Sequence, residues 1–256
     1  MTDGVLLHLA GPLQSWGGPK GGRVKGTHPY PTRSGVTGML AAALGRRRGA
    51  DLSDLDELVH LVRVDRPGRR MRDYHTIGGG LPAELTVVTA NGKRRGNALI
   101  FDSWYLADAA FTVAITGPRE TIGEVTAALR CPTFPPYLGR RSCPPSTPVL
   151  VTAGGDVEEQ LRRMPLHRPA PRPRWDRRSE QEQEQQEPVS VRYIAERQPG
   201  ASPGVPASRR VADVLVAGTW TSRPVWESQE SHPADRCHVG TEFLVELARW
   251  RRELHT

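Results

Sequence analysis

The segment at residues 109–115, with the one that follows it, constrains the fold more than any other part of this chain. Residues 109–115 read AAFTVAI, a mostly apolar, partly alternating run that is typical of a β-strand. Directly behind it, Ile122, Val125 and Leu129 share one face of a possible helix over residues 118–129. A strand that leads straight into an amphipathic helix predicts an α+β domain.

Weaker patterns before this segment predict the other elements of the domain. An apolar run at residues 5–9 predicts a first strand, and an amphipathic helix within residues 51–60 leads into a strand at residues 61–64. PTRSG at residues 31–35 is a helix start signal, because Thr32 or Ser34 can cap the Ala- and Leu-rich run behind it, which Gly45 closes. The order of these elements fits a split βαβ, ferredoxin-like unit.

Residues 77–107 interrupt that unit and predict a protruding β-hairpin. They contain three consecutive glycines, a basic cluster at residues 93–95, and strand-like pieces at residues 85–89 and 98–101. Insertions of this length in a compact domain are uncommon and usually functional.

The C-terminal part has a different character. We expect one domain over residues 1–150 and a small β region over residues 151–256, with strands at residues 189–194 and 211–216. A Glu- and Gln-rich tract predicts a flexible polar loop at about residues 170–188, because it buries too little apolar area to order itself. The tail over residues 242–254 has a helical period.

Charge and cysteine content limit the possible functions. The formal net charge is +7, and only three of the 35 basic residues are lysines. Such a basic chain suits a polyanionic partner. Three scattered cysteines without a C-x-x-C pair argue against a disulfide framework or a zinc ribbon. We expect no metal and no cofactor, because no Asp, Glu and His set has ligand spacing.

Other classes of ligand are also disfavoured. The glycines at positions 11 and 17 are one residue too far apart for a phosphate-binding P-loop, and no Gly-Lys-Ser/Thr follows. The pattern therefore argues against a nucleoside triphosphate site, and we expect no small-molecule substrate. No apolar run approaches ~20 residues and no signal peptide is evident, so we expect a cytoplasmic protein without membrane contact.

The turn at residues 137–146, YLGRRSCPPS, is the leading candidate for a binding site. Its two prolines exclude a core strand or helix. Adjacent guanidiniums behind an aromatic ring suit a kinked single-stranded RNA, whose phosphates need forked donors and whose bases need a flat face. The alternative interpretation is a surface turn with solvated arginines.

Three further segments offer matching groups. The helix start at residues 31–35 attracts anions and carries Arg33. The first strand offers no aromatic ring and no RNP-type string is present, so recognition should lie in loops. Trp16, Tyr74 and Tyr137 are the rings that we expect beside bases. The alternative for Trp16 and Tyr74 is packing at the bases of their loops.

Five strings occur in a fixed order along the chain: GPLQSWG at 11–17, PTRSG at 31–35, RDYHT at 72–76, DAAFTV at 108–113 and YLGRRSCP at 137–144. Together they closely resemble the "Cas five" family of type I-E CRISPR systems, in the RAMP superfamily, whose members are subunits of the Cascade complex. The resemblance covers residues 1–150 and thins through the C-terminal third.

This resemblance implies a modified RNA-recognition-motif (ferredoxin-like) fold with a protruding β-hairpin thumb. It implies a subunit that binds and caps the 5′ handle of the guide RNA (crRNA), with the thumb displacing a guide nucleotide at the handle–spacer junction. The implied partners are the backbone-forming subunit and the large subunit of Cascade, and target DNA is reached only through the complex.

The residues that would carry these roles follow by position. The thumb would span about residues 77–107, with the cations Arg72, Lys93, Arg94 and Arg95. The RNA-binding residues would be Gln14, Ser15, Trp16, Gly17, Thr32, Arg33, Ser34, Tyr74, His75, Tyr137, Gly139, Arg140, Arg141, Ser142 and Cys143.

Two alternatives to a subunit that binds the 5′ handle stay open. Some relatives in other subtypes cleave precursor RNA without metal, which requires a general base and a general acid. Tyr74 with His75, or His28 with Tyr30, would be the candidate pair, although we favour His75 as an anchor at the base of the thumb. A general basic RNA-binding module is the third possibility. We expect a non-catalytic protein.

Overall fold

The computed structural model describes residues 3–17, 20–21, 23–86, 88, 91–94, 98–171, 187–197, 208–216 and 219–254. Within them, an antiparallel seven-stranded sheet forms the body, in the order β12-β13-β11-β5-β8-β1-β9. Its strands are β1 (Asp3–Ala10), β5 (Val59–Arg66), β8 (Ala110–Gly117), β9 (Leu150–Gly155), β11 (Val189–Ala195), β12 (Arg209–Val216) and β13 (Thr219–His232).

The centre of this sheet is the pair of strands whose patterns were clearest in the sequence. β1 and β8 pair over their full length, from Asp3 opposite Gly117 to Ala10 opposite Ala110. Leu7 and Leu9 join one core, whereas Leu6 joins a second core on the opposite face. Both faces of the central strands are therefore covered by apolar side chains.

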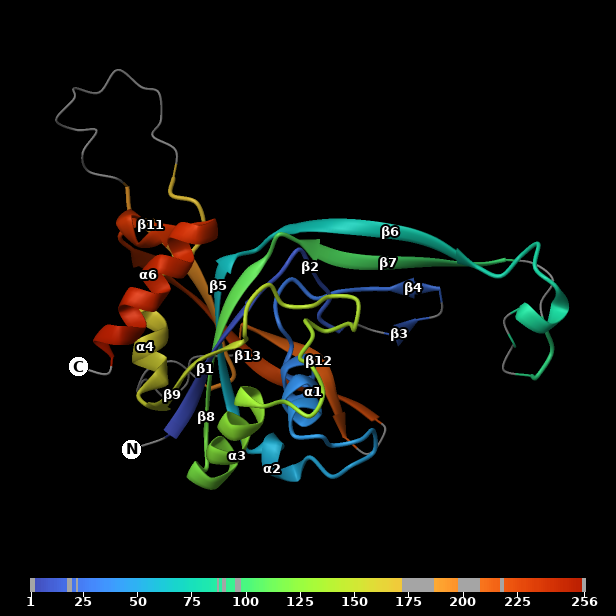
Figure 1. The fold of residues 1–256 in the computed structure, drawn as a ribbon, viewed down its shortest axis with the longest axis horizontal. Helices are drawn as coiled ribbons and strands as arrows, with labels where there is room; N and C mark the ends of the chain where they lie inside the picture. Colours follow the sequence, from blue (N-terminus) through green and yellow to red (C-terminus); the bar gives the residue numbers. More distant parts are fainter. Residues whose placement is uncertain are drawn as a thin grey trace, which may run out of the picture.

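Helices cover the two faces. α1 (Arg33–Ala43) and α3 (Arg119–Arg130) pack in the first core, and the short α2 (Ser53–Asp56) contributes Leu55 to it. α4 (Val157–Arg163) and α6 (Gly240–Glu253) pack in the second core (Figure 1). The first strand and the helices at 33–43 and 119–130 confirm the mixed α+β prediction.

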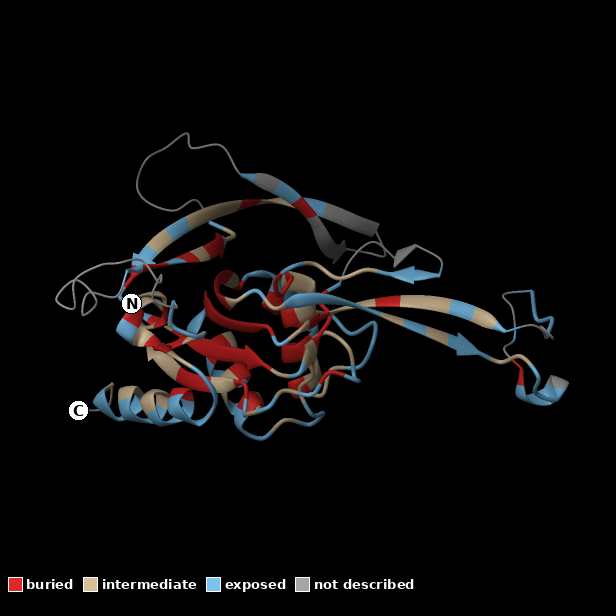
Figure 2. Ribbon diagram, turned by 90° about the horizontal axis from the view of Figure 1, so that it is seen from above, coloured by how far each residue is buried: buried red, intermediate tan, exposed pale blue. Residues whose placement is uncertain are grey.

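A second sheet extends sideways from the body. Its strand order is β2-β7-β4-β3, and β6 also pairs with β7. Its strands are β2 (Leu13–Gln14), β3 (Lys20–Gly21), β4 (Val24–Lys25), β6 (Arg69–Ile77) and β7 (Leu99–Ala107). β6 and β7 form a long ribbon that projects from the body (Figures 1 and 2), and most residues of β6 are exposed.

The ribbon is longer than the excursion predicted over residues 77–107. Its paired part runs from Arg69 opposite Ala107 to Ile77 opposite Leu99, so residues 72–76 lie within β6 rather than at its root. Leu85, expected in a strand, ends the 3-10 helix η1 (Ala83–Leu85). Val88 forms an isolated bridge with Arg94. β6 escaped prediction because arginines and other polar residues interrupt its apolar pattern.

The C-terminal strands do not form a region of their own. β11 pairs with β5 as well as with β13, so the sheet of the first half continues into the second. A parallel pair of short strands, β10 (Leu166–His167) and β14 (Cys237–His238), with the 3-10 helix η2 (Ala234–Arg236) just before β14, completes the described chain. Most of the polar loop predicted at residues 170–188 lies outside the described residues.

Candidate nucleic-acid interface

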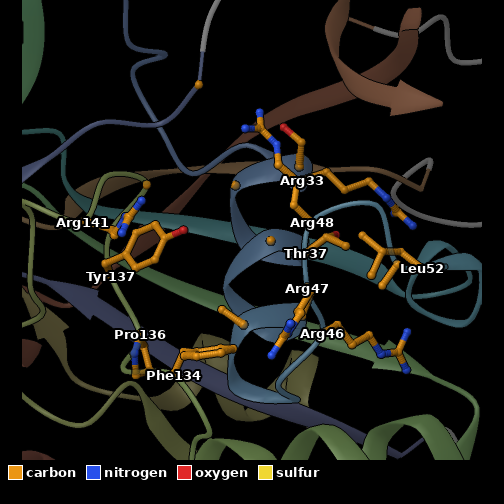
Figure 3. A pocket seen from close by; sticks show the side chains of 18 of the residues that line it. Arg33, Thr37, Arg46, Arg47, Arg48, Leu52, Phe134, Pro136, Tyr137 and Arg141 are labelled. Carbon is orange, nitrogen blue, oxygen red and sulfur yellow. The ribbon is translucent and has the colours of Figure 1, made fainter. Parts of the chain in front are cut away.

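A groove with a volume of about 1070 Å³ lies along the outer side of α1. Its floor is a stripe of small residues on that helix, among them Ser34, Gly38 and Ala42 at four-residue spacing. Figure 3 shows Tyr137 and Arg141 on one side of the helix and Leu52 on the other. The groove exists because the small side chains leave the helix surface uncovered between two rims.

One end of the groove is the N-terminus of α1. Thr32 is the N-cap, and its Oγ1 accepts a hydrogen bond of 3.2 Å from the N–H of Gly35. This cap was predicted from the sequence and is confirmed. Gly17 and Ser34 line the groove at this end.

The turn at residues 137–143 is fastened beside the loop at residues 14–17. The N–H of Ser15 donates to the carbonyl of Leu138 at 3.0 Å. Gly139 has φ +83°, and a Cβ added there would lie 1.8 Å from the carbonyl oxygen of Ser15. The close approach of the two loops therefore requires glycine at this position. As a result, Gly17, Ser34, Tyr137, Gly139 and Arg141, predicted from three separate motifs, line one groove.

Several predicted RNA-binding side chains are buried and support the loops instead. They are Gln14, Ser15, Trp16, Thr32 and Cys143, each no more than 2% exposed. The Gln14 amide donates to the carbonyls of Leu9 and Ala109, at 3.1 and 2.8 Å, and accepts from the Trp16 indole N–H at 2.8 Å. The prediction that Trp16 lies beside a base is wrong, because its ring packs in the core against Gly35.

Arg33 is also occupied within the protein. Its guanidinium donates to the carbonyl of Leu58 and to the carboxylate of Glu196, each at 2.6 Å, and to the carbonyl of Asp56 at 2.5 Å. With its side chain only 11% exposed, Arg33 ties the start of α1 to the end of α2. Arg33 lines the groove at its start, and its pairing with phosphate stays a prediction.

The two adjacent arginines of the turn point to different places. The guanidinium of Arg140 lies 4.7 Å from the centre of the Tyr105 ring on β7 and donates to the carbonyl of Lys25 at 3.2 Å. Arg141 and Ser142 are exposed, and Arg141 lines the groove (Figure 3). Arg140 therefore links the turn to the second sheet, while Arg141 faces the groove.

Tyr74 and His75 lie on opposite faces of the ribbon. Tyr74 is 58% exposed. The His75 ring stacks on Phe101 at 5.6 Å, with its Nδ1 3.3 Å from a carboxylate oxygen of Asp73. In the second candidate acid–base pair, Tyr30 is buried, with only 3% of its surface exposed.

Three of the four cations predicted for the thumb lie within the described residues. Arg72 pairs with Asp102 across the ribbon at 2.8 Å. Lys93 and Arg94 are exposed beyond its paired part, where Arg94 donates to the carbonyl of Glu84. Arg95 lies outside the described residues. RNA binding by these side chains stays a prediction.

The sequence reasoning missed a basic turn directly after α1. Arg46, Arg47 and Arg48 line the groove together with Phe134 and Thr37. Arg46 forms a 2.5 Å ion pair with Asp54, and the bonding between them raises the pKa of Arg46 and lowers that of Asp54. The signal that was available is the run of three arginines directly after the glycine that closes the helix.

Comparison with known proteins adds an independent line of support. The family model described as "CRISPR-associated protein (Cas_Cas5)" matches residues 4–201, more than half of the chain. The chain belongs to the Cas5 family. In the part of this Cas5 chain that the structure describes, no helix has the length and apolarity to span a membrane, and no His, Cys, Asp and Glu group has the arrangement of a metal site.

Individual Cas5 relatives agree with this assignment. The Cascade subunit CasD of the CRISPR system of Escherichia coli K12 is 38% identical over 173 residues, which is 59% of this chain and 71% of CasD. A chain of a solved "CRISPR RNA-guided surveillance complex" is 36% identical with a TM-score of 0.79, over 97% of this Cas5 and 99% of that chain. A crystal structure titled "Cas protein" is 30% identical with a TM-score of 0.59, over 93% and 98%.

Proposed function

We propose that this Cas5 protein is a non-catalytic subunit of a type I-E Cascade complex that binds and caps the 5′ handle of the guide RNA. The observation that carries the proposal is that Gly17, Ser34, Tyr137, Gly139 and Arg141, which come from three separate segments, line one groove. The likeness to CasD and to a surveillance-complex chain supports the assembly.

The groove has the chemistry that a single-stranded RNA needs. Tyr137 supplies a ring and Arg141 a charged fork on one rim, and the first turn of α1 adds N–H groups and the Ser34 hydroxyl. Such a site holds phosphates and splayed bases without a metal.

The β6–β7 ribbon is our candidate for the thumb. It projects beyond the body, and its outer part carries Tyr74, Lys93 and Arg94 in exposed positions. We propose that it lies over the guide at the handle–spacer junction and displaces one nucleotide. The backbone and large subunits would contact the protein around the same RNA, and target DNA would be reached through the complex.

The test is binding of repeat RNA and of a scrambled RNA of the same length. We expect the repeat RNA to bind more tightly, and its affinity to fall with salt with a log–log slope of roughly −0.7 per neutralised phosphate. Equal affinity for both RNAs would indicate a general basic RNA-binding protein and would contradict the proposal.

The same RNA incubated in EDTA tests the endoribonuclease alternative. His75 beside Asp73 is the observation that favours this alternative, because a carboxylate can orient a histidine base. We expect intact RNA. Site-specific cleavage that His75→Ala abolishes would contradict the non-catalytic proposal and indicate a metal-independent endoribonuclease.

A further inference from the structure

The groove continues beyond the predicted motifs to the C-terminal end of α1. There Phe134 lies on the same rim as Tyr137, and Arg46 and Arg47 lie on the opposite rim (Figure 3). None of the five sequence motifs includes these residues, so this end needs its own explanation.

Both rims are fastened to the same helix end. Gly45, at φ +78°, allows its own N–H to reach the carbonyl of Ala42 at 3.0 Å, and lets the N–H of Arg46 reach Ala41 at 2.9 Å. The neighbouring carbonyl, of Ala43, accepts the N–H of Thr133 at 2.9 Å. This anchor fixes the position of Phe134 relative to the basic turn, and it satisfies the carbonyls that would otherwise repel an anion.

The side chains that these anchors present are available to a ligand. Arg47 and Arg48 are exposed, and no ion pair joins either to a residue that the structure describes, whereas Arg46 is held by Asp54. Phe134 is 47% exposed. An exposed ring beside unpaired guanidiniums matches a base and a phosphate.

The arrangement also repeats along the groove. Tyr137 and Arg141 provide one ring and one cation, and Phe134 and Arg47 provide a second ring and cation nearer the end of α1. A polymer that alternates bases and phosphates fits this repetition better than an acidic peptide, which would use the arginines and leave the rings without partners.

We propose that this end of the groove is an additional nucleotide subsite, in which Phe134 stacks on a base and Arg47 pairs with the adjoining phosphate, while Arg48, which Figure 3 places nearer Arg33, pairs with the next phosphate along α1. The subsite rests on the proposed function, because it lengthens the path of the same RNA. It implies that the bound handle follows the whole of α1.

The experiment measures binding of the full chain to 3′-labelled RNA with the sequence of the repeat from its own CRISPR array, and to versions shortened one nucleotide at a time from the 5′ end. For Arg47→Ala/Arg48→Ala we expect affinity to fall about tenfold or more and the salt slope to become less negative by roughly 0.7 to 1.4, for one or two phosphates. For Phe134→Ala we expect a loss of roughly fivefold to a hundredfold with the salt slope unchanged, and recovery with Phe134→Trp.

A control double variant removes two exposed arginines of α6 on the other face of the sheet, Arg249→Ala/Arg251→Ala, and should bind like the parent protein. Against one shortened RNA, the groove variants should also equal the parent protein, because the nucleotide that they contact is gone.

Unchanged affinity and salt slope for Arg47→Ala/Arg48→Ala overturn the subsite while leaving the proposed function intact. If the groove variants bind RNA normally but no longer assemble into the complex, this end of the groove contacts a protein partner, and the nucleotide subsite is overturned as well. A parent protein that does not prefer repeat RNA overturns the proposed function itself.

Discussion

At the scale of single residues, Glu196 fixes one end of the groove. Its carboxylate lies 2.6 Å from Arg33 and 2.6 Å from Arg223, and it accepts the backbone N–H of His60 at 3.3 Å. The three charged side chains are only 11 to 18% exposed, so each loses most of its hydration on folding. The start of α1 is therefore held by charges that depend on one another.

Glu196→Ala should lower the free energy of unfolding by roughly 3 kcal/mol, because it leaves two poorly hydrated arginines without their shared carboxylate. Urea denaturation measures the change. Glu159→Ala provides the control, since Glu159 pairs with Arg163 at the surface, where a pair contributes about 0–1 kcal/mol. Equal losses in the two variants would show that Glu196 has no special role.

Gly139 tests the contact between the two loops. An added Cβ would meet the Ser15 carbonyl, so Gly139→Ala should displace the turn, destabilise the protein by about 1–3 kcal/mol and weaken RNA binding. Gly123→Ala is the matched control, because Gly123 lies in α3 with open space around it, and alanine there should stabilise by roughly 0.5–1 kcal/mol. If both variants are equally stable and bind RNA equally, the loops do not need this close approach.

Individual residues show what a sequence can and cannot reveal. The cap at Thr32 could be predicted because capping depends on neighbours within a few positions. The partner of Arg33 could not, because Glu196 is 163 positions away. Likewise, Trp16 next to glycines has the pattern of an exposed binding loop, and only the fold places its ring in the core.

At the scale of elements, α6 is attached to the body through two histidines. Phe243 of α6 stacks on His167 at 4.2 Å and lies 4.8 Å from His8 of β1. The two histidine rings are also joined, with 3.1 Å between His8 Nε2 and His167 Nδ1. A contact of this kind requires at least one of the rings to be neutral.

Acid should weaken this attachment. Burial is the main cause that lowers the pKa of His167 to about 4, assisted by Arg66 and opposed by Asp65 and Asp108. Burial also lowers the pKa of His8, with further contributions from His167, Arg63 and Arg66. Between an unfolded pKa near ~6.5 and those values, the unfolded chain binds protons that the folded chain does not, so stability falls as pH falls.

We expect the free energy of unfolding to fall as the pH is lowered from about 7 toward ~5, by up to ~1.4 kcal/mol per pH unit for each histidine. Urea denaturation at several pH values measures this. His167→Phe keeps a ring against Phe243 and should make the pH dependence shallower. A parent protein whose stability does not change over this range would contradict the prediction.

The elements differ in how far local sequence determines them. β1, β8 and α3 were predicted because their burial follows a clear apolar pattern. β13 was missed because polar residues and Pro224 interrupt its pattern, and pairing with β11 and β12 makes it a strand. The groove needed the same long-range information, since three segments predicted separately meet only after the sheet has formed.

At the scale of the whole molecule, the body and the ribbon have separate structural requirements. The body holds its cores between the sheet and helices on both faces, whereas residues of β6 are mostly exposed. Beyond the paired strands, Leu81, Leu85 and Val88 are at least half exposed. The outer part of the ribbon therefore adds little to the stability of the body.

Replacing residues 78–98 by Asn-Gly tests this division. Ile77 and Leu99 are paired, so two residues between them can close the hairpin with a type I′ turn. We expect the free energy of unfolding to change by less than about 1 kcal/mol and handle affinity to change little, because no buried contact of the body is removed.

In the reconstituted complex, a 2-aminopurine at the handle–spacer junction should lose the fluorescence of a displaced base. If the shortened protein still displaces that nucleotide, residues 78–98 do not act as the thumb. If it loses handle binding altogether, the groove does not bind the handle independently of the ribbon.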